Sequence, residues 1–305
     1  MIAMVLSSFA FFGLPAAASD VVTDFSGNGA SLRWYIVNDT VMGGRSSSKF
    51  DVEEGALTFA GTLNTNGGGF ASIRTRPSEL PLAGSAGVHL RVRADGREYQ
   101  LRLEQRGESS RRTTSYRAKF KVAKGEGWQD VWLPYSSFIA TWRGRTLDRP
   151  PVDAARVASI GLMVADGIDG PFKLEVESIR TYKPFAMNSL RWSARPLVVF
   201  APKADDERVK LQLAAIEKSR TRFAERDMVL VLIVDDGTSY AGSRPLTRAE
   251  SEAVRRDLRV ERGRFVVKLV GKDGGVKHVN PKPSDLLGIY EKIDGMPMRR
   301  SEMRE

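Results

Sequence analysis

Polar and aromatic residues suited to ligand binding occur close together in the first half of the chain. Asn38 and Asp39 follow Trp34 at a short interval, and Trp142 is followed directly by Arg143 in a polar stretch. An exposed Trp beside polar groups can stack on a sugar ring while those groups bind its hydroxyls. The alternative for both Trp residues is packing in a core. The pattern predicts a binding site rather than a reaction centre.

Cationic residues alternate with apolar residues along three short runs, as on the outer face of a half-buried strand. The runs are Val88–Arg93, Tyr99–Glu104 and Tyr116–Val122. If these strands neighbour one another, one sheet face presents six cations to an anionic sugar, a lipid headgroup or an acidic protein. The alternative is a solvated outer face. The six cations are Arg91, Arg93, Arg102, Arg117, Lys119 and Lys121.

Residues of common catalytic sites are scarce. The chain contains no cysteine, which excludes disulfides, thiolate metal sites and a thiol nucleophile. His89 is the sole histidine of the first half, and no G-x-S-x-G sequence accompanies it. Asp39, Asp166 and Asp169 are candidate Ca²⁺ ligands, with simple turns as the alternative. Asp39 and Asp166 are also candidate hydrolase acids. We therefore expect no enzymatic activity, no cofactor and no bound metal.

Length and composition indicate a globular protein of two domains. The chain has 305 residues, of which 42% are hydrophobic and 28% charged, and this length exceeds that of a usual single domain. The net charge of +10 is distributed over both halves. Diffuse positive charge slightly favours anionic partners, but we expect no nucleic acid as a partner.

The first residues predict export. The apolar run Ile2–Leu14 is too short for a membrane span, and Ala16–Ala18 after it is typical of a cleavage site. Residues 1–18 are therefore predicted to be a signal peptide. We expect a periplasmic or extracellular protein without stable membrane insertion after cleavage.

Residues 19–184 predict an all-β domain, because short alternating runs are separated by Gly, Pro, Asn or Asp clusters. Glycine clusters at Gly43-Gly44 and at Gly67–Gly69 predict backbone that turns through positive φ or passes close to another group. The stretch containing both clusters, Val37–Arg76, is similar to the complex I intermediate-associated protein 30 family. So are WQDVWLPYSSF at Trp128–Phe138 and SIGLMV at Ser159–Val164, with Gly170-Pro171-Phe172.

The resemblance extends in order over nearly all of this domain. Members of the family look like galactose-binding-type jelly rolls, and the mitochondrial members assist assembly of respiratory complex I. The resemblance therefore implies an all-β jelly-roll sandwich that binds a partner. The chain departs from the family in its predicted export signal and in its second domain.

Residues 185–193 are predicted to be a linker, and residues 194–305 an α/β domain. Continuous apolar runs at Arg195–Phe200 and Met228–Val234 are typical of strands buried on both faces. Thr247–Glu250 is a capping box, and Lys272–Gly275 is a hairpin signal. The expected order β-α-β-α-β-β-α is that of a thioredoxin-like fold.

This half resembles the domain of unknown function 4174 family through RPLVVFAP, ERDMVLVLIV, LVGKDGGV and IDGMPMRRSEMR. The resemblance implies a thioredoxin- or peroxiredoxin-related domain. Redox-active relatives carry a nucleophilic cysteine in the turn that is Ala201–Asp206 here, and this turn has none. We expect a cysteine-free scaffold, with Met296–Arg300 as a candidate partner contact or a simply packed terminus.

Together these features predict an exported, non-enzymatic binding or assembly protein. Its partner is expected to be a protein or a glycan, with anionic partners favoured. The alternative function is a carbohydrate-binding module acting on cell-envelope polysaccharide. The predicted ligand-binding residues are Asn38, Asp39, Arg91, Arg93, Arg102, Arg117, Lys119, Trp142 and Arg143.

Overall fold

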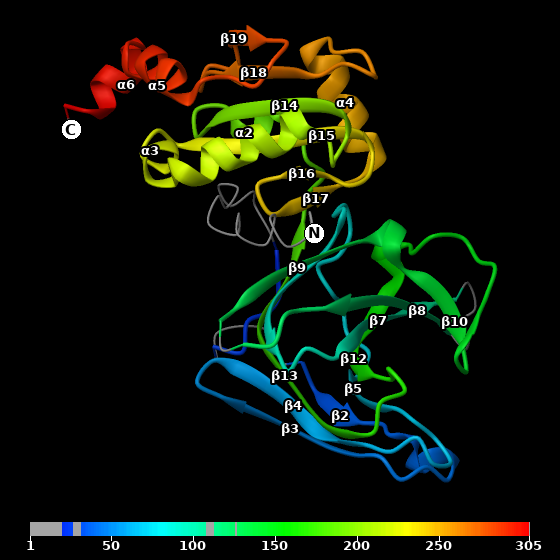
Figure 1. The fold of residues 1–305 in the computed structure, drawn as a ribbon. Coiled ribbons are helices and arrows are strands. Elements are labelled where there is room, and N and C mark those ends of the chain that lie inside the picture. The colour runs from blue at the N-terminus through cyan, green and yellow to red at the C-terminus, as the bar shows by residue number, and fades with distance from the viewer. Residues whose placement is uncertain (1–19, 27–31, 108–112, 126, 305) are drawn as a thin grey trace. The chain divides into compact units, whose positions relative to one another are not determined.

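The computed structural model describes residues 20–26, 32–107, 113–125 and 127–304. The predicted signal peptide lies outside the described residues. Contacts divide the chain between Lys183 and Pro184 into two compact units. Figure 1 shows the strands and helices of each unit.

The first unit consists of two antiparallel sheets. One sheet has the strand order β3-β4-β13-β6-β9, with β1 beside β13, and the other has the order β11-β10-β8-β7-β12-β5-β2. The first sheet contains β1 (Val21–Thr23), β3 (Ser47–Glu53), β4 (Ala56–Leu63), β6 (Gly87–Ala94), β9 (Gln129–Pro134) and β13 (Gly170–Tyr182). The seven-stranded sheet contains β2 (Trp34–Ile36), β5 (Ala71–Thr75), β7 (Glu98–Arg106), β8 (Thr113–Lys121), β10 (Ile139–Trp142), β11 (Arg145–Thr146) and β12 (Val157–Val164).

Alternation along the strands builds the core between these sheets. Val88, Leu90 and Val92 of β6 are fully buried, and so are Leu101 and Leu103 of β7. These side chains belong to one apolar cluster with residues from both sheets, so the sheets pack face to face. The predicted jelly-roll-like β-sandwich is confirmed. Short 3₁₀ turns connect some strands: η2 (Asp39–Met42), η3 (Tyr135–Ser137) and η4 (Ala154–Arg156).

The three cationic strands do not form a single face. β7 and β8 are neighbours in the seven-stranded sheet, but β6 pairs with β13 and β9 in the other sheet. The outer faces of the two sheets point away from each other, since the core lies between them. The prediction of six cations on one face is therefore wrong, because it assumed that β6 is beside β7.

The second unit has one mixed sheet with the order β17-β16-β15-β14-β18-β19, in which β14 and β15 are parallel. Its strands are β14 (Arg195–Lys203), β15 (Met228–Asp236), β16 (Ser239–Ala241), β17 (Arg244–Leu246), β18 (Val266–Val270) and β19 (Val276–Asn280). Its helices are η5 (Met187–Leu190), α2 (Glu207–Lys218), α3 (Arg220–Ala224), α4 (Arg248–Leu258), α5 (Leu286–Asp294) and α6 (Pro297–Glu302).

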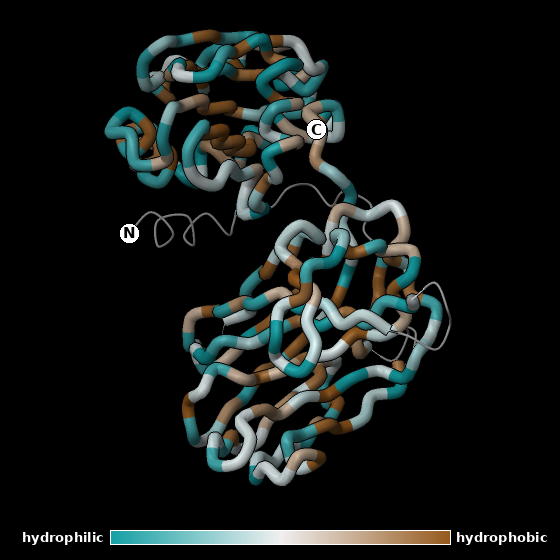
Figure 2. The backbone as a smooth tube through the Cα atoms, turned by 90° about the vertical axis from the view of Figure 1, so that its right-hand side faces the viewer, coloured by the Kyte–Doolittle hydropathy of each residue, from teal (hydrophilic) through white to brown (hydrophobic). Residues whose placement is uncertain are grey.

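Helices cover both faces of this sheet. Residues of α2, α3 and α5 join one apolar cluster, and residues of α4 and η5 join another. Figure 2 shows hydrophobic stretches on the inner strands of this unit. The continuous apolar runs of β14 and β15 follow from this double coverage. The predicted capping box of α4 is present: Thr247 Oγ1 accepts from the Glu250 amide, and Glu250 Oε2 accepts from the Thr247 amide.

The stretch predicted to be a linker is packed into the second unit. Phe185 and Leu190 are buried beside Val198 and Phe200 of β14. The short length of this stretch made it look like a connection, but its apolar residues complete one face of the sheet. Among the described residues, no helix combines the length and apolar character that a bilayer span requires.

Candidate binding groove

A groove of about 870 Å³ lies on the outer face of the seven-stranded sheet. Side chains from β5, β7, β8, β10 and β12 line it, together with Met42 and the Gly68–Phe70 loop. These strands bury their apolar side chains in the sandwich core, so the alternate residues point outward and line the groove. Arg74, Gln100, Arg102 and Arg117 are among these outward residues.

Three arginines form a cross-strand row on this face, which we call the arginine row: Arg74, Arg102 and Arg117. Arg102 on β7 lies directly opposite Arg117 on β8. On its other side Arg102 is opposite Gly161 of β12, and Gly161 is opposite Arg74 of β5. Because Gly161 has no side chain, the Arg74 side chain occupies the space above it, and an added Cβ there would lie 3.2 Å from Arg74 Cγ. The row therefore runs from β8 to β5.

The groove carries a strong excess of positive charge. Arg143 and Arg149 join the arginine row in its lining, and among the described lining residues Glu104 is the sole carboxylate. Within the described part of the chain, no ion pair joins any of these five arginines to an acidic side chain. Their charges are thus available to an anionic ligand.

Arg102 lies at the centre of the row, between Arg74 and Arg117. Its Nη2 donates to Ser115 Oγ, and its Nη1 lies 3.4 Å from Met163 Sδ. Burial lowers the pKa of Arg102; the nearby Arg74 and Arg117 lower it further, while Glu104 opposes them. A negative charge placed in the groove would relieve this repulsion.

Trp142 and Arg143 lie at the β10 end of the groove, where the chain turns into β11. Arg143 and Gly144 both have positive φ, at 47° and 79°, so the turn is tight. Trp142 is 59% exposed, and the Arg143 guanidinium lies 4.8 Å from the centre of its ring. The structure therefore brings Trp142 and Arg143 together with Arg102 and Arg117 in a single groove.

Asn38 and Asp39 do not face the groove. Asp39 is fully buried, and its carboxylate accepts hydrogen bonds from the Ser46 hydroxyl at 2.6 Å and from the amides of Ser46, Gly69 and Phe70. Asn38 Oδ1 accepts from the Ser48 hydroxyl and the Ser72 amide. Both side chains hold neighbouring segments together, so they are structural and not ligand groups.

The two glycine clusters pack against Asp39. A Cβ at either Gly44 or Gly68 would overlap the Asp39 side chain, and Gly43, Gly67 and Gly69 have positive φ. Burial would raise the pKa of Asp39, but the hydrogen bonds to its carboxylate outweigh burial and lower the pKa. A buried anion thus organises the loops that end one side of the groove.

Three further predicted cations, Arg91, Arg93 and Lys119, lie outside the groove lining and have acidic partners. Arg91 contacts Asp130 at 3.0 Å, and Arg93 contacts Glu175 at 2.7 Å, both on the outer face of the other sheet. Lys119 is on the groove side of the sandwich but pairs with Glu98 at 2.7 Å. The two outer faces thus differ: the described cations predicted for the β6 face are neutralised, and those of the groove are not.

The three aspartates considered for calcium or acid catalysis have separate partners. Asp166 pairs with Arg97 at 2.6 Å, and Asp169 accepts from the Thr65 amide at 2.7 Å. Within the described ranges, no group of three or more His, Cys, Asp or Glu side chains is arranged to hold a metal ion. Trp34 packs against the core and against Phe25.

The sequence interpretation missed Arg74, Arg149 and Gln100. For Arg74 a signal existed, since apolar Ala71 and Ile73 alternate with polar Ser72 and Arg74 in its strand. Gln100 precedes Arg102 on the same face by two residues. Arg149 lies in an irregular segment, where no periodicity indicates direction.

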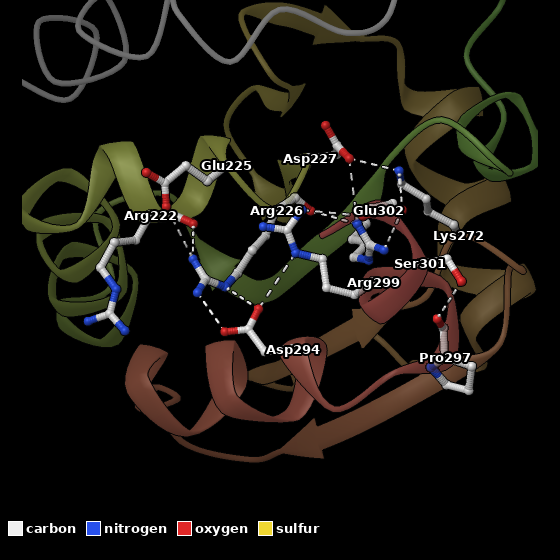
Figure 3. Close-up of polar contacts among 11 residues, drawn as sticks. Arg222, Glu225, Arg226, Asp227, Lys272, Asp294, Pro297, Arg299, Ser301 and Glu302 are labelled. Carbon is white, nitrogen blue, oxygen red and sulfur yellow. Dashed lines mark hydrogen bonds and ion pairs between the residues drawn. The ribbon is translucent and has the colours of Figure 1, made fainter. Parts of the chain in front are cut away.

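The second unit contains a cluster of charges at its C terminus (Figure 3). Arg195 is only 1% exposed, and its Nη2 donates to Glu302 of α6 at 2.8 Å. Lys272 contacts both Glu302 and Asp227. Burial would raise the pKa of Glu302, but hydrogen bonds from Arg195 and Lys272 outweigh it and lower the pKa to about 2. The cluster fixes α6 on the sheet, which gives the C-terminal residues a packing role.

The acidic residues at the ends of β14 and β15 do not form a site together. Asp206 caps α2 by accepting from the Arg208 amide, and it pairs with the Arg208 side chain. Asp235 pairs with Arg255 of α4 at 2.7 Å. Asp206 and Asp235 therefore each pair with a different arginine and do not share a ligand.

Two family models match the chain, one for each unit. Residues 23–176 match Complex I intermediate-associated protein 30 (CIA30), and residues 186–302 match Domain of unknown function (DUF4174). Both predicted resemblances are confirmed.

Curated relatives are similar to part of the chain. "Complex I intermediate-associated protein 30, mitochondrial" of Drosophila melanogaster is 30% identical over 183 residues, covering 53% of this chain and 62% of the relative. The protein of the same name from Mus musculus is 34% identical over 97 residues, covering 31% of this chain and 30% of the relative. The chain thus spans less than two thirds of these relatives.

The relatives correct one prediction. They are named mitochondrial proteins, so the prediction of a periplasmic or extracellular location is wrong. The apolar N-terminal run suggested export because its length and small-residue pattern match a signal peptide, and that segment lies outside the described residues.

Solved structures with distant similarity include carbohydrate-binding modules. A Family 11 module from Clostridium thermocellum, in complex with a β-1,3-1,4-mixed-linked tetrasaccharide, is 17% identical and has a TM-score of 0.40. It covers 55% of this chain and 97% of the module. A solution structure of CtCBM11 gives 17% identity and a TM-score of 0.42, covering 57% and 100%. The sandwich architecture described above is established by the strand pairing itself.

Proposed function

We propose that this chain, which belongs to the Complex I intermediate-associated protein 30 family, is a non-enzymatic binding protein that holds a protein partner during assembly of a larger complex. The names of its curated relatives support this function, because they state association with an intermediate of complex I. The groove of the seven-stranded sheet is the proposed contact surface.

The observation that carries the proposal is the contrast between the two outer faces of the sandwich. The groove combines an exposed Trp142 with five arginines that have no acidic partner among the described residues. On the other face Arg91 and Arg93 are neutralised by Asp130 and Glu175. Exposed Trp and Arg are the residues most enriched at interaction hot spots.

The second unit is proposed to be a thioredoxin-like scaffold. Parallel β14 and β15, followed by antiparallel β18 and β19, support this class. Since the chain has no cysteine, the unit would act without thiol chemistry. For the first unit, we likewise propose that the β-sandwich is of the galactose-binding type.

Site-specific photo-crosslinking tests the proposed contact surface. Benzoylphenylalanine is placed at Met42, which lines the groove, or at Val52 on the other sheet, and both positions are exposed. The full chain is then irradiated in an extract of its own cells. Reproducible protein adducts from position 42 and none from position 52 are expected. Equal labelling at both positions, or no adduct from position 42, would refute the groove as the contact.

A second candidate function is glycan binding. It is favoured by Trp142, which lies in the same groove as the hydroxyl side chains of Thr113, Thr114 and Ser115. Calorimetry with neutral and acidic oligosaccharides tests it. Binding that is lost in Trp142→Ala would support this function, and absence of heat across the panel would remove it.

A further inference from the structure

The guanidinium groups of the arginine row repel one another, and no acidic side chain among the described residues neutralises them. Like charges placed directly opposite each other destabilise a sheet, and Arg102 and Arg117 are in this position. Gly161 allows a third guanidinium side chain, that of Arg74, to lie over the next strand. On a sheet face that contacts only solvent, three neighbouring arginines without acidic partners would lower stability and bring no benefit. The row indicates an anion that spans several strands.

Buried polar atoms in the groove indicate which hydrogen-bonding groups the ligand carries. Arg74 Nε, Arg102 Nε and Gln100 Oε1 are buried and have no hydrogen-bond partner among the described residues. Gln100 is only 2% exposed, and it lines the groove. Unpaired guanidinium donors fit carboxylate oxygens, whereas an unpaired amide oxygen requires a donor such as a peptide N–H. A peptide segment with acidic side chains carries both kinds of group along one backbone, so it offers acceptors to the arginines and a donor to Gln100.

Apolar side chains complete the groove. Met42 and Trp142 are exposed beside Phe70, Leu147 and Met163. Uronic-acid chains offer carboxylates but few apolar groups, and nucleic acids offer phosphates. Acidic residues interspersed with leucine or valine offer both kinds of contact along one extended backbone. Trp142 already has the Arg143 guanidinium over its ring, which leaves less ring surface for a stacked sugar.

We infer that the groove binds an extended acidic segment of a protein partner, with its carboxylates on the arginine row and its apolar side chains against Trp142 and its neighbours. The inference rests on the proposed function and adds the chemical class of the partner's contact. Charge complementarity also predicts that salt weakens binding.

Fluorescence polarisation with the full chain tests the inference. The probe is a fluorescein-labelled peptide in which Glu and Leu are interspersed, and its matched control has Gln in place of every Glu. The acidic peptide is expected to bind, with an affinity that falls as salt rises, and the Gln peptide is expected not to bind. Arg102→Gln and Arg117→Gln should each weaken binding about tenfold, as loss of one charge-assisted contact does.

Arg91→Gln is the matched control variant, since Arg91 has the same charge but lies on the other sheet and pairs with Asp130. It should leave peptide affinity unchanged. Thermal unfolding of each variant separates loss of binding from loss of fold. Arg117→Gln is the more conservative of the two groove changes, because Arg102→Gln also removes the hydrogen bond from Arg102 to Ser115 Oγ.

Failure of the inference is distinguishable from failure of the proposed function. No binding of the acidic peptide, or equal loss in Arg91→Gln, overturns the inference. If position 42 still crosslinks to a partner in that case, the proposed function remains. If an oligogalacturonate binds and the acidic peptide does not, the ligand is a glycan and the inference is wrong.

Discussion

Arg102 and Arg117 lie directly opposite each other on adjacent strands, with Arg74 one strand beyond Gly161. Two guanidinium groups in this position repel each other, and neither has an acidic partner among the described residues. The concentration of positive charge on this face of the sheet therefore lowers the stability of the sandwich. This relationship separates the groove from an ordinary solvated surface, on which opposite charges alternate.

Arg117→Gln should increase stability. Removing one member of a repelling cross-strand pair is expected to raise the free energy of unfolding by about 0.2–1 kcal/mol at low salt. The gain should shrink at high salt, because salt screens the repulsion. Urea unfolding at two salt concentrations measures both effects. A loss of stability at both concentrations would mean that Arg117 makes a stabilising contact.

Gly68→Ala should destabilise the sandwich. The added methyl group would overlap the buried Asp39 carboxylate, which four hydrogen bonds hold in place. Overpacking of this kind costs about 1–3 kcal/mol. Gly125→Ala is the control, since nothing lies within 4 Å of its added Cβ and its φ is not positive. Equal unfolding midpoints for the two variants would contradict the proposed role of Asp39.

Glu302 should make the stability of the second unit depend on pH. Its pKa falls from the ordinary value of 4.5 to about 2 in the folded state. A lowered pKa contributes stability above pH 4.5, and this contribution is lost as the pH falls toward 2. Glu302→Gln should therefore cost stability at neutral pH, on the order of 2 kcal/mol, and much less near pH 2.

The measurement compares urea midpoints of the wild type and Glu302→Gln at neutral and acid pH. Glu261→Gln is the control, because Glu261 is exposed in the same unit. A difference between wild type and Glu302→Gln that stays constant with pH would show that the ion pairs with Arg195 and Lys272 contribute little.

Trp142→Ala should abolish partner capture without loss of stability. Trp142 is 59% exposed, so its removal takes little apolar area from the core and should change the free energy of unfolding by less than about 0.5 kcal/mol. Crosslinking from position 42 should fall to background, because exposed aromatic anchors dominate binding energy. Undiminished crosslinking in a stably folded Trp142→Ala variant would exclude Trp142 from the contact.

Local sequence patterns were sufficient for much of the fold. Alternation placed Leu101 and Leu103 inward and Arg102 outward, and the capping box placed the start of α4 at Thr247. Motifs identified both families. These features depend on residues close together in the chain, whose periodicity reports directly on burial.

The sequence by itself thus determined the inner faces of β6, β7 and β8, the absence of thiol chemistry and the family. Only the tertiary structure decided that β6 leaves β7 and β8 for the other sheet, that Asp39 is a buried anchor, and that Glu302 meets Arg195. The physical reason is that strand partners and buried ion pairs join residues far apart in the chain. Alternation fixes the direction of a side chain, but it does not say which strand lies beside it.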